Sequence, residues 1–256
     1  MKISFVIPAH NEEKMIGRCL ESVFKEIAQT EALSKLGHPM TKFESEVVVV
    51  DNASTDHTRE EALRFPNVTV VRENLKGLVY ARRAGWVATD GDIVANIDAD
   101  TMLPPGWLQK VMTEFEKDKN LVALTGPYIY YDLNTLQNMI VKIWYFPGWL
   151  FNLISQPLGR AVMLQGGNFV LRRDAWERAG GFDTSIAFYG EDADVARRIS
   201  KYGKVLWTWR LPMYTSARRL KHEGFLTTGW HYFSNIVVTH ITGRPATRDY
   251  TDIRVE

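Results

Sequence analysis

The chain has 256 residues, of which 45% are hydrophobic, and this is enough to bury the core of one large domain. Its formal net charge of +1 argues against a nucleic-acid-binding protein, because such proteins usually carry a basic excess. The single cysteine, Cys19, excludes a disulfide-stabilised scaffold and is typical of a reducing compartment, so we expect a cytoplasmic location. The N-terminus runs directly into an apolar segment of strand length, which is too short for a secretory signal.

Strands and helices alternate through the first half of the chain. Apolar runs predict four strands, at residues 3–7, 46–50, 68–71 and 93–97. Apolar residues with helical periodicity predict three helices between and after these strands. One begins at residues 11–13, and the other two cover residues 77–88 and 107–115. This order predicts an α/β fold, with a mostly parallel sheet sandwiched by helices. Ligands bind such sheets at the carboxyl ends of the strands, so the polar residues there are the first candidates for a site.

Two carboxylates, Asp98 and Asp100, follow the fourth strand one residue apart. Alternate strand residues point in opposite directions, so a turn after Ile97 has to bring both side chains to one ligand. Oxygen ligands on a loop suit Mg²⁺ or Mn²⁺, which often share a substrate phosphate. The same pattern also occurs in ordinary turns closed by aspartate hydrogen bonds. Polar clusters after the first and second strands, at residues 8–13 and 51–56, favour the ligand site.

Six motifs over residues 3–200 resemble, in this order, the inverting family 2 glycosyltransferases, which have the nucleotide-sugar-binding GT-A fold. The motifs are Phe5–Glu13, Val50–Asp56, Asn74–Gly77 with Ala81–Gly85, Asp98–Asp100, Gly180–Asp183 and Gly190–Asp192. The resemblance implies a nucleoside pocket that contains Pro8, Ala9, Asn11, Glu12 and Asp51. It also implies that Asp100 lies closest to a divalent metal, Mn²⁺ or Mg²⁺, that Asp98 lies toward the ribose, and that Asp192 is the catalytic base.

A departing nucleoside diphosphate needs cationic partners, which stabilise the charge that develops in the transition state. Lys76 and Arg82 flank the start of the helix near Gly77 and are candidates, although a solvated basic face is the alternative. By resemblance, the basic cluster that contains Arg218 closes over the diphosphate, and His222 is a third metal ligand. Gly167 predicts either a close approach of substrate to the backbone or a tight bend.

The choice of the base stays open from the residues alone. Helical spacing places Glu191 and Asp194 on one face and directs Asp192 elsewhere, so Glu191 is also a candidate substrate contact. Acidic residues at a helix start also serve as caps and complement the helix dipole. The resemblance favours Asp192.

Residues 143–159 carry no charge and are dense in aromatic side chains, and residues 224–243 form a second uncharged stretch. Proline, glycine and polar residues interrupt both, so neither predicts a membrane-spanning helix. Tryptophan and tyrosine favour the membrane interface, which indicates peripheral contact with the cytoplasmic face of a membrane. A flap packed on the sheet and a subunit contact are the alternatives.

We therefore expect one GT-A domain, with a nucleotide-sugar-binding half at residues 1–130, an acceptor-binding and catalytic-base half at 131–243 and a polar tail at 244–256. The predicted activity is metal-dependent, inverting transfer from a nucleotide diphosphate sugar, UDP-sugar by default, to an acceptor hydroxyl or phosphate. The acceptor is a sugar, a polyprenyl phosphate or a lipid-linked molecule, and the oligomeric state stays open. A catalytically silent scaffold at a membrane surface is the main alternative. A haloacid-dehalogenase-type phosphatase is disfavoured, because Met102 stands where that motif needs threonine or valine.

Overall fold

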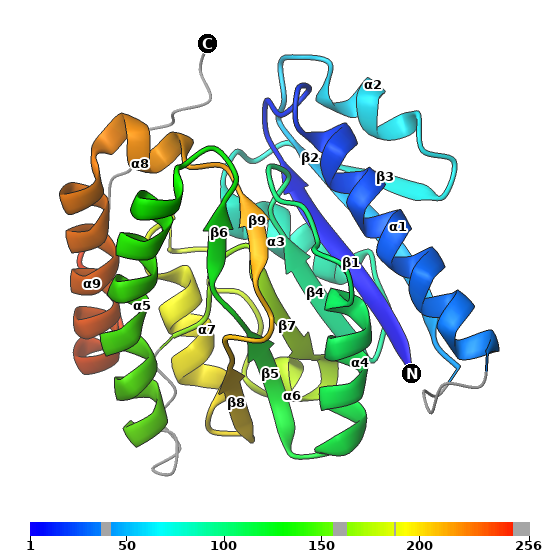
Figure 1. Cartoon of the computed structure of the whole chain (residues 1–256). Helices are drawn as coiled ribbons and strands as arrows, with labels where there is room; N and C mark the ends of the chain where they lie inside the picture. Colours follow the sequence, from blue (N-terminus) through cyan, green and yellow to red (C-terminus); the bar gives the residue numbers. More distant parts are fainter. Residues whose placement is uncertain (37–41, 156–162, 187, 248–256) are drawn as a thin grey trace.

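The computed structural model describes residues 1–36, 42–155, 163–186 and 188–247. Seven strands in this part of the chain form one sheet in the order β3-β2-β1-β4-β7-β5-β8 (Figure 1). The strands are β1 (Lys2–Ala9), β2 (Glu44–Asn52), β3 (Val68–Glu73), β4 (Ile93–Ile97), β5 (Leu121–Thr125), β7 (Asn168–Arg172) and β8 (Lys204–Trp207). Neighbouring strands are parallel except where β7 runs antiparallel to β4 and β5. The predicted mostly parallel sheet is confirmed.

Helices cover both faces of the sheet. Apolar residues of α1 (Ile16–Lys35), α2 (Thr58–Leu63) and α4 (Trp107–Lys117) pack with alternate residues of β1 in one core. The opposite face is covered by α3 (Leu78–Val87), α6 (Arg173–Arg178) and α7 (Glu191–Ile199). Helix α3 packs closely on β1, since a Cβ added at Gly85 would lie 2.3 Å from Cγ1 of Val6. This contact packs the C-terminal turn of α3 against β1 and β2.

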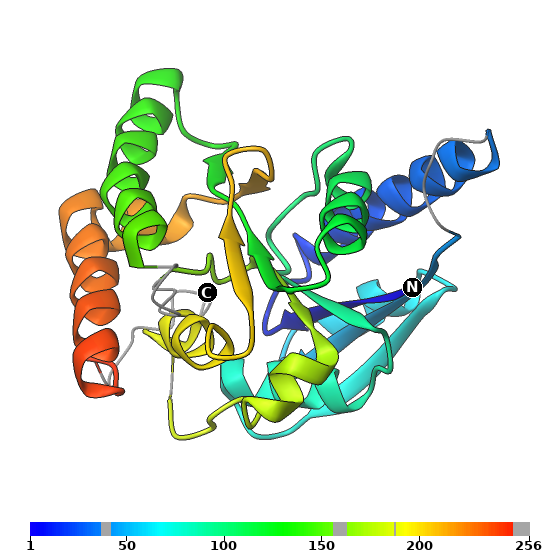
Figure 2. The ribbon, with the colours of Figure 1, turned by 90° about the horizontal axis from the view of Figure 1, so that it is seen from below.

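A second layer lies in front of the side of the sheet that contains β7, β5 and β8 (Figure 1). Strands β6 (Tyr128–Tyr130) and β9 (Met213–Thr215) pair in a parallel ribbon. Helices α5 (Thr135–Ser155), α8 (Arg218–Glu223) and α9 (Phe225–Thr242) complete the layer. Figures 1 and 2 show α5 and α9 side by side at one end of the molecule. Their side chains meet, because the Phe151 and His240 rings lie 6.2 Å apart and a Cβ at Gly229 would lie 3.0 Å from Trp144.

Two elements differ from the sequence-based expectation. The first helix begins at Ile16 rather than at residues 11–13, because Asn11 has a left-handed φ of 52° and keeps the chain in a loop. The interrupted aromatic segment is instead continuous helix to Ser155, with Pro147 inside α5. Residues 156–159 of that segment and residues 248–256 of the predicted tail lie outside the described residues. None of the helices in the described ranges is both long and apolar enough to cross a membrane.

Candidate functional site

Two adjoining hollows lie at the carboxyl edge of the sheet, and Asp98 and Phe188 line both of them. The first, of about 400 Å³, is also lined by Pro8, Ala9 and Lys76. We call it the donor hollow, after the sugar donor that the sequence predicts to bind beside Pro8 and Ala9. The second, of about 580 Å³ including space open to solvent, lies toward α8 and α9, and we call it the acceptor hollow, after the acceptor predicted to bind in this half of the chain.

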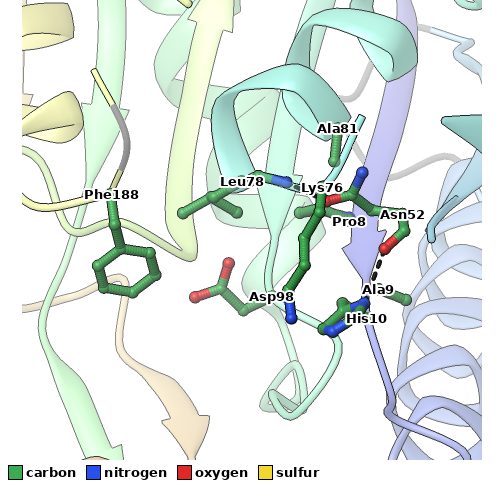
Figure 3. Close-up of a pocket in the computed structure, with 10 residues that line it drawn as sticks. Pro8, Ala9, His10, Asn52, Lys76, Leu78, Ala81, Asp98 and Phe188 are labelled. Carbon is green, nitrogen blue, oxygen red and sulfur yellow. Dashed lines mark hydrogen bonds between the residues drawn. The ribbon is translucent and has the colours of Figure 1, made fainter. Parts of the chain in front are cut away.

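The donor hollow is organised by His10 and Asn52, which lie in the predicted polar clusters but were given no individual role from the sequence. The Asn52 amide oxygen accepts a hydrogen bond from the backbone N–H of Gly77 at 2.8 Å, and its NH₂ group donates to the Leu75 carbonyl at 2.7 Å. The Nδ1 atom of His10 lies 2.8 Å from the Asn52 carbonyl oxygen (Figure 3). Asn52 thus anchors the loop that carries Lys76, whose side chain reaches into the hollow beside Asp98 (Figure 3).

The loops after β1 and β2 are joined by hydrogen bonds, and two of the residues that form them, Asn11 and Asp51, are predicted to bind the nucleoside. The Asn11 side-chain oxygen accepts a hydrogen bond from the Thr55 backbone N–H at 2.8 Å. The hydroxyl of Ser54 accepts from the Asn11 backbone, and the Ser54 N–H donates to the buried Asp51 carboxylate, both at 3.2 Å. These contacts bring Asn11 and Asp51 to the same edge. Their binding of a nucleotide stays a prediction.

Asp98 and Asp100 both line the acceptor hollow, as the turn predicted after Ile97 requires, and each faces an arginine. Oδ1 of Asp98 lies 3.3 Å from Nη2 of Arg82, while Oδ2 of Asp100 lies 3.1 Å from Nη2 of Arg218. Arg218 also forms a two-pronged ion pair with the buried carboxylate of Glu12. This guanidinium therefore bridges the end of β1 and the carboxylate of Asp100.

Arg82 lies at the centre of the site and is 1% exposed. It donates hydrogen bonds to the Glu191 carboxylate, to the Gly166 carbonyl at 2.6 Å and to Asp98 at 3.3 Å. Burial alone would lower the pKa of Arg82, but the charges of Glu191 and Asp98 outweigh it and raise that pKa. Arg82 is thus a fixed cation that ties the end of β4 to the start of α7, rather than part of a solvated face.

Glu191 and Asp192 begin α7 directly after Gly190, which has a φ of 82°. Burial raises the pKa of Asp192 to about 6 and that of Glu191 to about 7, although Arg82 acts in the opposite direction on both. Both carboxylates face the same backbone, because a Cβ at Gly166 would lie 3.9 Å from Oδ2 of Asp192 and 3.8 Å from Oε1 of Glu191. A carboxylate with a pKa near neutrality is suited to general-base chemistry.

The alternative base Asp194 lies outside the site. Its carboxylate is buried and pairs with Arg197 at 3.0 Å and with Arg198 at 2.8 Å, both on its own helix. The interpretation that Glu191 and Asp194 face the pocket together is therefore wrong. Helical spacing alone missed this, because the arginines three and four residues on compete for the Asp194 carboxylate.

Gly167 lies where only glycine fits. A Cβ there would lie 2.2 Å from Cγ of Asp98 and 2.5 Å from the Tyr128 hydroxyl. That hydroxyl accepts a hydrogen bond from the Gly167 N–H at 2.6 Å and donates to Asp98 at 3.4 Å. The described neighbours of the Gly167 backbone are thus Asp98 and Tyr128, and the predicted approach of substrate to this backbone stays a prediction. Tyr128 gave no signal in the sequence, since no motif includes it.

Replacing Gly167 by alanine is expected to displace Asp98, and overpacking of this kind costs about 1–3 kcal/mol of folding free energy. Thermal unfolding measures this loss, and a transfer assay measures the accompanying fall in activity. Gly166→Ala is the matched control, because its added Cβ has no neighbour closer than 3.8 Å. Equal effects of the two substitutions would contradict the assignment.

Hard oxygen ligands for a divalent cation are present at Asp98 and Asp100, in the acceptor hollow. His222 is exposed on α8. Within the described ranges, no three or more His, Cys, Asp or Glu side chains gather closely enough to hold a metal. Two carboxylates fit Mg²⁺ or Mn²⁺ that also binds substrate phosphates and water, as these ions commonly do. His222 as a third ligand stays a prediction.

Sequence comparison identifies the family. The sequence profile described as "Glycosyl transferase family 2" matches residues 4–180, more than half of the chain. The chain belongs to glycosyl transferase family 2. The predicted membership and the GT-A fold are confirmed.

Individual glycosyltransferases resemble parts or most of the chain. Dolichol-phosphate mannosyltransferase of Pyrococcus furiosus is 32% identical over 133 residues, 50% of this chain and 34% of that protein. Glucosyl-dolichyl phosphate glucuronosyltransferase of Haloferax volcanii is 24% identical over 241 residues, 88% of this chain and 70% of the relative. The chain spans less than half the length of two other curated relatives, 47% of one and 27% of the second.

Among solved structures, a mannosyltransferase of Pyrobaculum calidifontis in complex with GDP-Man and Mn²⁺ superposes with a TM-score of 0.66. The two chains are 21% identical, and the superposition covers 97% of this chain and 65% of that one. At this identity the similarity shows a shared fold.

Proposed function

We propose that this family 2 enzyme catalyses metal-dependent, inverting transfer of a sugar from a nucleotide diphosphate sugar to a lipid-linked acceptor. UDP-sugar is the default donor. The observation that carries the proposal is the position of Asp98, which lines both hollows. A donor in the first hollow then has its diphosphate beside Asp98 and Asp100 and its sugar directed toward the second.

The residues that line the donor hollow suit a nucleoside diphosphate. Pro8 and Ala9 supply apolar atoms for a base, and Lys76, Gly77 and Leu78 line the hollow at the start of α3, where the first N–H groups of a helix are free to bind an anion. A lysine beside a helix N-terminus favours phosphate through its charge and through the helix dipole. The Pyrobaculum calidifontis neighbour holds GDP-Man in the same fold, which supports a sugar nucleotide here.

Asp100, with Asp98, would hold Mn²⁺ or Mg²⁺, which supplies positive charge to the departing diphosphate. Arg218 contacts Asp100 and Glu12, so its guanidinium lies where it can add a second positive charge to the same phosphates. Arg82 keeps Asp98 in place from the buried side. The leaving-group side of the reaction is thus lined by cations on two elements, α3 and α8.

Asp192 is the proposed base. It removes the proton from the acceptor hydroxyl while the oxygen attacks the anomeric carbon, and a single displacement inverts that carbon. A phosphate acceptor is largely ionised at neutral pH and needs little help from a base. The raised pKa of Asp192, about 6, therefore favours a hydroxyl acceptor over a phosphate. The relative from Haloferax volcanii is named for acting on glucosyl-dolichyl phosphate, a lipid-linked sugar, which supports this choice.

Thermal unfolding with Mn²⁺ and a panel of UDP, GDP, dTDP and CDP tests the donor site. A ligand at 100 times its Kd stabilises the folded state by about 2.7 kcal/mol, so one nucleotide is expected to raise the melting temperature clearly. The shift should disappear in Asp100→Asn or without metal. Asp174→Asn is the control, because its exposed side chain lies on α6. His222→Ala tests the third ligand by the same shift.

No shift with any nucleotide would favour the alternative, a catalytically silent scaffold. A shift that survives in Asp100→Asn would contradict the proposed metal site while keeping the donor hollow. The phosphatase alternative receives no support, because the chain is a glycosyltransferase by family.

A further inference from the structure

We propose that the outer faces of α5 and α9 together form a surface that docks on an anionic lipid bilayer. The surface is defined by six exposed side chains and is called the apolar face: Ile143, Ile154, Trp230 and Phe233, with half-exposed Trp144 and Phe151 where α5 and α9 meet. Each is at least 50% exposed. The inference deepens the lipid-linked acceptor of the proposed function and rests on it only for the identity of the acceptor.

Helix α9 is amphipathic, but its polar face packs against the protein and its apolar face is exposed. The buried residues of α9 are polar: Thr228, Asn235 and Thr239. Asn235 and Thr239 pack against Gly190 at the start of α7, since a Cβ there would lie 3.5 Å and 3.1 Å from their side-chain oxygens. The large apolar residues point outward, and Leu226 and Ile241 are more than 75% exposed.

Helix α5 repeats this arrangement. Among its described side chains the one buried residue is Asn152, whereas Ile143 and Ile154 are more than 60% exposed. A helix in water normally directs its apolar stripe to the core. Two adjacent helices with the opposite orientation form a contiguous apolar surface, and such surfaces mark protein or membrane contacts.

The charges around the apolar face match an anionic surface. Neither α5 nor α9 contains an acidic residue, and Lys142 is the single charged residue of the pair apart from histidines. Arg244, directly after α9, is exposed, while Lys221 on α8 pairs with Asp132 at 2.9 Å and adds no net charge there. Basic residues near a membrane surface are attracted by anionic lipids, while aromatic and aliphatic side chains enter the interface. Charge and apolar character thus agree on a bilayer.

Helix α9 lies between the apolar face and the acceptor hollow. It contributes Thr228 and Tyr232 to the lining of that hollow, whereas exposed Trp230, two residues from each, points to the other side of the helix. Docking through α9 therefore places the acceptor hollow one helix away from the lipid headgroups. A lipid-linked acceptor can then enter the hollow while its hydrocarbon tail stays in the bilayer.

Co-sedimentation of the full chain with vesicles tests the proposal without donor or acceptor. We expect binding to phosphatidylcholine vesicles that contain phosphatidylglycerol, with weaker binding to phosphatidylcholine alone. The variant Trp230→Gln with Ile143→Gln is expected to lower the partition coefficient at least 10-fold. Leu63→Gln with Val87→Gln is the matched control, because both residues are more than 50% exposed on α2 and α3.

Two controls complete the test: light scattering measures the oligomeric state, and thermal unfolding measures whether the variants fold. Unchanged melting temperatures show that the variants fold, and an unchanged nucleotide shift separates this result from the fate of the donor site. Equal binding of both double variants, or no binding by the original chain, overturns the proposal. A dimer in solution that Trp230→Gln dissociates would also overturn it, because a second copy would then cover the apolar face.

Discussion

Replacing Asp192 by asparagine is expected to lower the rate of sugar transfer by about 10²–10⁴-fold, the usual contribution of a general base. Asparagine has the same shape but cannot accept the proton of the attacking hydroxyl. Donor binding should persist, because the Asp192 side chain lies beside Gly166 and does not line the donor hollow. Transfer to a lipid-linked sugar measures the rate, and the nucleotide-induced thermal shift measures binding.

The pH profile provides the control for this assignment. Asp192 acts as a base only when deprotonated, and its pKa is raised to about 6 by burial. The rate should therefore rise as the pH increases through about 6 and level off above it, and this rise should be absent from the residual activity of Asp192→Asn. Glu191→Gln should retain the rise. If Glu191→Gln removes the rise and Asp192→Asn does not, Glu191 is the base.

Replacing Arg82 by methionine is expected to cost about 3–5 kcal/mol of folding free energy, because it leaves the Glu191 carboxylate buried without its cation. Chemical denaturation measures this loss. Arg83→Met is the matched control, since the adjacent arginine is exposed on the same helix. Its effect should be small, because exposed charges contribute little.

A double variant separates the structural role of Arg82 from its role in the site. Arg82→Met with Glu191→Leu removes both buried charges, and such replacements are often neutral or stabilising. We expect stability to recover while transfer stays slow, because Asp98 still lacks its buried partner. Recovery of full activity together with stability would show that Arg82 only supports the fold.

The strands of the fold could be predicted from sequence because their signal is local. The apolar run over residues 93–97 became β4 with the same ends, and the β-branched run around Val48 lies within β2. Helix α5 was missed as a continuous helix because Pro147 and Gly148 usually end helices. The apolar outer face of α5 gave no core-facing stripe from which its limits could be inferred.

The site was predictable where a motif follows a strand and unpredictable where two distant elements meet. Asp98 and Asp100 stand next to β4, so their position at the sheet edge follows from local sequence. The pairing of Arg82 with Glu191 depends on how α3 and α7 pack, which no local pattern encodes. Tyr128 reaches Asp98 from a strand of the second layer, so its role appears only when that layer is placed.

The ion pair between Arg218 and Glu12 joins residues that are 206 positions apart in sequence. Contacts of such separation are expected to form late, because the entropy of closing the intervening loop has to be overcome before they stabilise the fold. Strands β1 to β4 can pair once residue 97 has left the ribosome, but Asp100 then lacks its arginine. During synthesis the strands on the donor side can therefore pair well before the site is complete. Arg218, which completes it, is synthesised with α8, directly before α9 and its part of the apolar face.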